Sequence, residues 1–151
     1  MQKLDDELTV FSAVPGRELW SGANDTLHEK VGEDYPRDTF RHEQDLLVTE
    51  NGRTALFAGC AHCGIVNILK SAEEVLGRAP DAVFAGFHLY NPSLGKSEPD
   101  ALVDAVGEKL REDKVAHYFT GHCTGKEAYA RLKAKLGDRL GEMPAGADFT
   151  L

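Results

Sequence analysis

The 151-residue sequence lacks the features of several protein classes. It has no basic run, and its 25 acidic against 17 basic side chains give a net charge of -8. Nucleic acid and anionic membranes bind clustered Lys and Arg, so neither partner is expected. No stretch approaches the ~20 apolar residues of a membrane span, and residues 1–30 lack the apolar centre of a signal peptide. We expect a cytoplasmic protein.

Cysteine is scarce, with Cys60, Cys63 and Cys123 the three thiols of the chain. An odd count with a single C-x-x-C does not suit the disulfide framework of a secreted domain. One C-x-x-C without a second pair is also an incomplete structural zinc site. The thiols are therefore expected to be reduced rather than joined in disulfides.

The residues present predict one α/β domain (α+β by some schemes) over 1–151. A long irregular segment occupies 15–41, where Gly, Pro and Asn interrupt the apolar pattern. Asn51-Gly52 between two apolar runs predicts a β-hairpin. The predicted strands cover 8–11, 46–49, 54–58, 82–85, 115–119 and, in the tail, 148–151. The predicted helices cover 64–76, a segment ending near 111, and 128–136.

Three strand–loop–helix units thus follow one another, and each strand ends near a histidine: His62, His88 and His122. If the strands are neighbours in a parallel or mixed sheet, all three imidazoles emerge at one edge. His62 and His122 are the stronger candidates because cysteines and glycines surround both. His88 could instead be a core-edge residue bonded to backbone.

The C-x-x-C of Cys60 and Cys63 is open to three interpretations. Between a strand and a helix it resembles a thioredoxin-like redox pair, whose first thiol is acidified by the helix dipole. It could supply metal ligands, or the two residues could simply fill space.

The loop Thr124-Gly125-Lys126 lies at a predicted helix start. Free amides, a hydroxyl and a lysine together predict an anion site for phosphate or carboxylate. An ordinary capped helix is the equally plausible alternative.

Four motifs together resemble the metallo-β-lactamase superfamily, and within it the dihydropterin-ribofuranosylaminobenzene phosphate synthase-like branch. They are His42-Glu43-Gln44, Gly59-Cys60-Ala61-His62-x-Gly64-Ile65-Val66-Asn67, Gly86-Phe87-His88-Leu89 and Thr120-Gly121-His122-Cys123-Thr124-Gly125. The resemblance implies an αββα sandwich that holds one or two metal ions, usually zinc, with iron or manganese as alternatives. It also implies a hydrolase activity.

The resemblance assigns metal ligation to His62 and His122, and it places Cys60 where a loop residue approaches the metal. It gives His88 a catalytic position, as a contact to metal or to substrate phosphate. Cys63 departs from the small or polar residue usual at its position, so a redox role or a role as an extra ligand stays open for it.

The superfamily's principal metal motif, His-x-His-x-Asp-His, is absent from the chain. The chain therefore resembles the C-terminal half of a member. One apolar sheet face would then lack its cover, so a homo-oligomer or a complementary subunit is expected.

We expect a metal-dependent, hydrolase-like protein for a small, phosphate-bearing substrate, and an enzyme if a His-x-His-x-Asp-His segment completes it. The alternatives are a thioredoxin-like redox protein and a non-catalytic half-domain that needs a partner chain.

Overall fold

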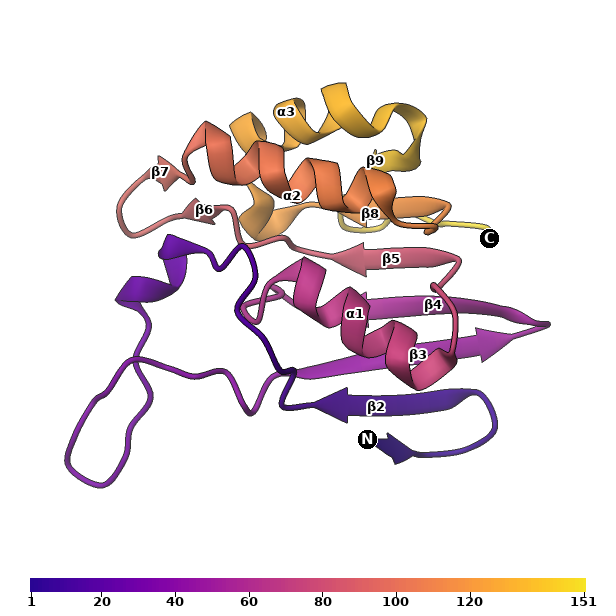
Figure 1. Ribbon diagram of the computed structural model, residues 1–151, viewed down its shortest axis with the longest axis horizontal. Coiled ribbons are helices and arrows are strands. Elements are labelled where there is room, and N and C mark those ends of the chain that lie inside the picture. Colours follow the sequence, from indigo (N-terminus) through magenta and orange to yellow (C-terminus); the bar gives the residue numbers. More distant parts are fainter.

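Seven strands form one mixed sheet, in the order β1-β2-β3-β4-β5-β8-β9, in the computed structural model, which describes residues 1–151 (Figure 1). β1 to β4 pair antiparallel, whereas β4, β5, β8 and β9 run parallel. The seven strands are β1 (Gln2–Lys3), β2 (Leu8–Ser12), β3 (Gln44–Glu50), β4 (Arg53–Ala58), β5 (Ala82–Ala85), β8 (His117–Thr120) and β9 (Leu140–Glu142). A separate small ladder pairs β6 (Tyr90–Asn91) with β7 (Lys96–Ser97).

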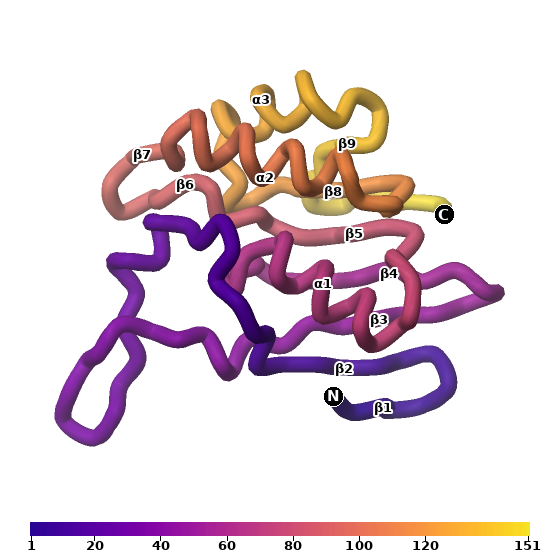
Figure 2. The backbone as a smooth tube through the Cα atoms, viewed as in Figure 1, coloured from indigo at the N-terminus to yellow at the C-terminus, as the bar shows by residue number.

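Three α-helices connect the parallel strands: α1 (Ile65–Leu76), α2 (Asp100–Glu112) and α3 (Lys126–Leu136). Parallel crossovers are right-handed, and the strand order advances in one direction, so all three helices cover the same face. Figure 2 traces this path along the backbone. A core cluster of 25 buried residues joins the helices to the sheet. The short 3-10 helices are η1 (Gly22–Thr26), η2 (His122–Thr124) and η3 (Gly137–Arg139). None of the helices has the length and apolar character needed to cross a membrane.

The predicted hairpin is confirmed and delivers the first candidate loop. Asn51 and Gly52 both have positive φ, at 50° and 78°, as a type I′ turn requires. β3 and β4 pair in register from Leu46–Phe57 to Glu50–Arg53. The chain therefore leaves β4 at Ala58, two residues before Cys60.

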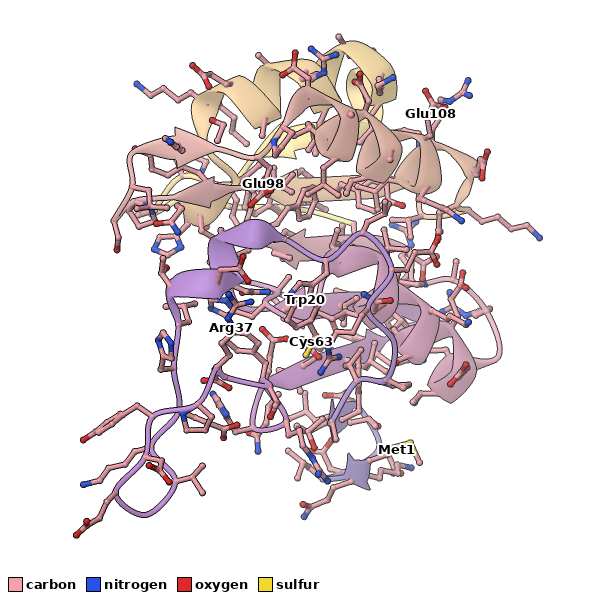
Figure 3. All side chains as sticks on the ribbon, turned by 60° about the vertical axis from the view of Figure 1, so that its left-hand side comes forward. Met1, Trp20, Arg37, Cys63, Glu98 and Glu108 are labelled. Carbon is pink, nitrogen blue, oxygen red and sulfur yellow. The ribbon has the colours of Figure 1, made fainter.

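The irregular segment 15–41 contains only η1 and two isolated bridges. Leu19, Trp20 and Leu27 nevertheless pack against the core, so the segment is attached to the domain rather than loose. Figure 3 labels Trp20 of this segment and Cys63, a member of the core cluster against which Trp20 packs.

The predicted strand at 148–151 is wrong, because the last strand is β9. In this tail apolar Phe149 and Leu151 alternate with polar residues, which produced the strand-like pattern. The alternation instead reflects side-chain contact with one face of the sheet, since both residues pack against the cluster around Phe84.

A row of three phenylalanines crosses the face of the sheet opposite the helices. Phe57, Phe84 and Phe119 are in register on β4, β5 and β8. Their rings stack at centroid distances of 4.9 and 4.8 Å. Phe149 covers the latter two rings, whereas Phe57 stays 40% exposed. The hollow over this face has a volume of about 960 Å³. It is larger than a separate pocket beside His122, whose volume is about 540 Å³.

Asp45 on β3 is a buried carboxyl without a partner. It is 1% exposed, and neither of its oxygens accepts or donates a hydrogen bond. Burial, together with the charge of Glu43, raises the pKa of Asp45 to about 8. The folded chain therefore holds a proton on Asp45 at pH values where the unfolded chain has lost it.

This proton linkage predicts that stability falls as pH rises from about 4 to about 8. Asp45→Asn should flatten that dependence and stabilise the fold at pH 9 by on the order of 3 kcal/mol, because no charge is then buried. Urea unfolding across this pH range measures both effects. The exposed Asp138→Asn serves as control and should leave the pH profile unchanged. An unchanged profile in Asp45→Asn would refute the assignment.

Candidate metal centre

The candidate residues follow the ends of three adjacent parallel strands. Ala58, Ala85 and Thr120 are register partners across β4, β5 and β8. The loops that contain Cys60 and His62, His88, and His122 therefore start at one level of one edge. The predicted convergence of the three histidine loops is confirmed.

Each of these loops holds a non-glycine residue in the left-handed region. The φ angles are 55° at Ala61, 47° at His88 and 50° at His122. Such conformations cost free energy and persist where the surrounding structure imposes them, often at functional sites. Three of the seven non-glycine residues with positive φ thus lie in the three loops of this edge.

The His62 ring contacts two other rings. Phe40 stacks on it at 4.6 Å with an interplanar angle of 5°, and the His88 ring lies 4.1 Å away. Burial lowers the pKa of His62, against the opposing charge of Glu43. The neutral ring is the form that binds a metal.

Asn24 fixes the tautomer of that ring. Its amide nitrogen donates to the His62 carbonyl oxygen at 2.8 Å, so its oxygen is the atom 3.1 Å from His62 Nδ1. Nδ1 must then donate the proton, which leaves the lone pair of Nε2 free. This is the arrangement of a histidine prepared for metal ligation.

Glu43 fixes the backbone of the same loop. Its carboxylate accepts from the backbone N–H groups of His62 and Cys63, at 2.7 and 2.8 Å. Charge-assisted hydrogen bonds of this kind are stronger than neutral ones. The resemblance motif included Glu43, but sequence reasoning gave it no role, and it missed Asn24 and Phe40 altogether.

His88 is 6% exposed, and neither ring nitrogen has a hydrogen-bond partner. The backbone bond that the sequence left open for it does not reach hydrogen-bond geometry, although the nearby Ala23 backbone opposes the fall of the His88 pKa. Burial, and then the neighbouring His62, lower the pKa of His88 to about 4. A buried neutral imidazole with two unpaired nitrogens is costly unless something else binds there.

The predicted ligands separate into two groups. Cys60 Sγ lies 3.5 Å from His122 Nδ1, and the Cys123 thiol completes a group whose ligand atoms all lie within 4.8 Å of one another. His62 is not in that group and pairs with His88. Burial and the neighbouring Cys60 raise the pKa of Cys123 to about 12. Sequence reasoning did not select Cys123, although it directly follows His122.

The C-x-x-C does not have the thioredoxin arrangement. α1 begins at Ile65 after the N-cap Gly64, so Cys60 lies outside the first turn, where the dipole acts. Cys63 is 1% exposed, and its thiol donates to the Phe40 carbonyl oxygen at 3.5 Å. Burial, reinforced by Glu43, raises the pKa of Cys63 to about 12. Cys63 therefore packs inside the domain, while Cys60 lies with His122.

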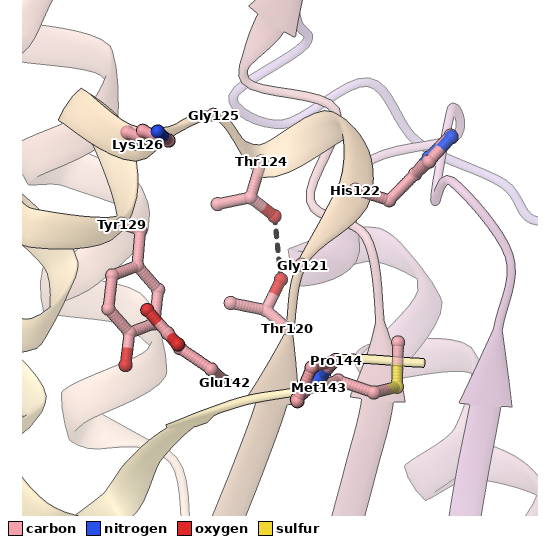
Figure 4. Close-up of a pocket in the computed structure, with 10 residues that line it drawn as sticks. All are labelled: Thr120, Gly121, His122, Thr124, Gly125, Lys126, Tyr129, Glu142, Met143 and Pro144. Atoms are coloured by element: carbon pink, nitrogen blue, oxygen red, sulfur yellow. Dashed lines mark hydrogen bonds between the residues drawn. The ribbon is translucent and has the colours of Figure 1, made fainter. Parts of the chain in front are cut away.

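A pocket of about 540 Å³ lies beside His122, between the start of α3 and the tail (Figure 4). Gly125 and Lys126, predicted for an anion site, line it together with Tyr129 and Glu142. The Thr124 hydroxyl is buried and bonded to Thr120 at 2.6 Å and to the Phe87 N–H at 2.9 Å. It does not cap α3, whose N-cap is Gly125.

Comparison with known proteins identifies the fold type of the chain. No protein-family model matches the chain. A solved metal-dependent hydrolase of the β-lactamase superfamily matches 99% of this chain with a TM-score of 0.78 at 20% identity. The chain has a metallo-β-lactamase-type fold. It spans 56% of that hydrolase chain.

A curated relative adds sequence similarity to this metallo-β-lactamase-type fold. It is 7,8-dihydropterin-6-methyl-4-(beta-D-ribofuranosyl)-aminobenzene-5'-phosphate synthase from Methanocaldococcus jannaschii, 34% identical over 101 residues. The match covers 66% of this chain and 32% of the synthase, so the chain spans about a third of the relative's length.

The Glu43 contacts generate a stability prediction. Glu43→Ala should lower the free energy of unfolding by about 2 to 4 kcal/mol, because two charge-assisted hydrogen bonds are lost. Glu50→Ala, an exposed change at the far end of β3, the strand that Glu43 precedes, should stay within about 0.5 kcal/mol. Urea unfolding monitors both. Equal stability of the two variants would mean that the carboxylate does not hold the His62 loop.

Proposed function

We propose that the chain carries the active site of a metal-dependent hydrolase that acts on a phosphate-bearing small molecule. The observation that supports it most is His88. This buried ring with two unpaired nitrogens lies against His62, at the sheet edge where Cys60 and His122 meet. The solved neighbour of this fold is a metal-dependent hydrolase, which implies a metal ion for this edge.

The residues at this edge fit a metal ion. His62 offers Nε2, since Asn24 binds its other nitrogen, and His122 and Cys60 offer an imidazole nitrogen and a thiol. Nitrogen and sulfur donors suit zinc first, with iron and manganese as further candidates. When bound, such an ion lowers the pKa of water and polarises a phosphoryl oxygen.

His88 would act on the substrate as a neutral imidazole. With its pKa at about 4, it carries one proton at neutral pH. One ring nitrogen can donate to a phosphoryl oxygen while the other accepts, so the ring orients the substrate without adding charge.

Two observations support a phosphate group on the substrate. The curated relative is named as a synthase of a 5'-phosphate. In this chain Gly125 and Lys126, the N-cap and first residue of α3, line the pocket next to His122. A lysine beside a helix N-terminus favours an anion at that position.

The hydrolase proposal is tested with metal-free protein and a synthetic phosphodiester, bis-p-nitrophenyl phosphate. Adding zinc, iron(II) or manganese should restore release of nitrophenolate. His62→Ala should lower kcat/KM about 100-fold, because the Nε2 donor beside His88 is lost. The exposed His28→Ala should retain the rate of the unmodified chain. Absence of turnover with all three metals would contradict the proposal.

The same proposal includes a partner for the phenylalanine face. Phe57 is 40% exposed and continues the row of Phe84 and Phe119, beside a hollow of about 960 Å³. Apolar surface of this kind favours association. We propose a second copy of the chain or a complementary subunit as its cover.

Analytical ultracentrifugation of the purified chain tests self-association. The chain should sediment as a dimer or larger, and Phe57→Asp should shift it to monomer because the charge would be buried in the contact. Leu94→Asp alters a 58% exposed apolar side chain outside this face and should leave the mass unchanged. A chain that stays monomeric at every concentration would exclude a second copy as the cover of this face and leave the complementary subunit as the proposed partner.

A further inference from the structure

Cys123 adds a second sulfur to the group around His122. The Cys60 loop follows β4, and His122 and Cys123 lie in η2 after β8. The fold thus joins residues 62 and 63 positions apart in the sequence. Two thiols and one imidazole have their ligand atoms within 4.8 Å of one another.

The spacing of the Cys60 and His122 ligand atoms suits a tetrahedral ion. Zinc binds thiolate at about 2.3 Å and imidazole nitrogen at about 2.0 Å, which places the two ligand atoms about 3.5 Å apart in a tetrahedron. Cys60 Sγ and His122 Nδ1 lie 3.5 Å apart. The pair therefore needs little movement to close on an ion.

The backbone around the group leaves room for the second sulfur. Gly86 directly follows β5, and a Cβ on Gly86 would lie 2.5 Å from Cys123 Sγ. His122 adopts a left-handed φ of 50°, and its side chain is exposed. Figure 4 shows this ring turned away from the Thr120–Thr124 hydrogen bond. The group is thus open toward solvent on the His122 side and closed on the Cys123 side.

We infer that Cys60, Cys123 and His122 bind one thiophilic divalent ion, with two sulfurs and one nitrogen as ligands. The inference rests on the proposed function for the presence of an ion at this edge, and it replaces His62 by Cys123 in the ligand set of that ion. Three protein ligands leave one tetrahedral position for water or substrate, as in catalytic zinc sites. His62 remains beside His88, available to the substrate or to a second ion.

The ligand set selects the class of metal. Thiolates favour zinc and related soft or borderline ions over magnesium and calcium, which prefer oxygen. Cobalt(II) occupies such sites and reports sulfur ligation through a near-ultraviolet charge-transfer absorption. That absorption does not depend on enzymatic activity.

The test titrates cobalt(II) into the metal-free full chain under anaerobic, reducing conditions. One equivalent should produce the sulfur-to-cobalt band, and one equivalent of zinc should remove it. Cys60→Ser and Cys123→Ser should each weaken the band and lower cobalt affinity about tenfold or more. The double variant should abolish the band.

Cys63→Ala is the matched control, because Cys63 is the remaining thiol and lies outside the group. It should keep the band and the stoichiometry. Thermal unfolding verifies that each variant is folded, and Cys60 is only half-buried, so Cys60→Ser provides a safe comparison if Cys123→Ser unfolds. Gly86→Ala should weaken cobalt binding about tenfold, since it displaces the Cys123 sulfur.

Cobalt binding without the band, a band that survives the double variant, or no cobalt binding would each overturn the inference. Its failure is separable from failure of the proposed function. Metal-dependent hydrolysis without a sulfur band would retain the function and reject these ligands. A sulfur band without hydrolysis under any of the three metals would retain the ligands and reject the function.

Discussion

Parallel hydrogen bonding among β4, β5 and β8 aligns the ends of three strands, and every candidate ligand follows one of those ends. The register partners Ala58, Ala85 and Thr120 lie at one level of the sheet edge, and the three loops begin directly after them. A shift of one residue in either pairing would turn side chains to the opposite face. The site therefore depends on the same register that packs Leu56, Val83 and Tyr118 against the helices.

The His62 loop is held in place by polar groups from distant parts of the chain. Glu43 binds the amides of the His62 loop, and Asn24 binds the His62 ring and carbonyl. Phe40 covers the ring. Glu43 directly precedes β3, whereas Asn24 and Phe40 belong to the irregular segment 15–41. That segment therefore supports the site. Preorganisation of this kind lets a ligand bind without a large ordering cost.

The two faces of the sheet have different roles. One face is covered by α1, α2 and α3, and the other presents the row of phenylalanines with only the C-terminal tail across part of it. Phe149 covers Phe84 and Phe119 but leaves Phe57 exposed. Burial of that remaining apolar area would favour association, and it would place a partner close to the edge that carries the ligands.

The sequence alone determined most of the elements and their order. Apolar periodicity located the helices and the central strands, Asn51-Gly52 located the hairpin, and repeated strand–loop–helix units implied parallel strands with His62, His88 and His122 at one edge. These features depend on neighbours in the sequence, so local patterns reveal them. The tail was misjudged because the alternation of Phe149 and Leu151 arises equally from strand pairing and from one-sided packing.

Only the tertiary structure decided how the ligands divide. Whether Cys60 lies with Cys63 or with Cys123 depends on the distance between β4 and β8, which no local pattern contains. The roles of Asn24 and Glu43 are likewise contacts across 38 and 19 residues. The unpaired nitrogens of His88 and the buried carboxyl of Asp45 are properties of the packed interior. Residue types can propose such groups, but burial and partners exist only once the chain has folded.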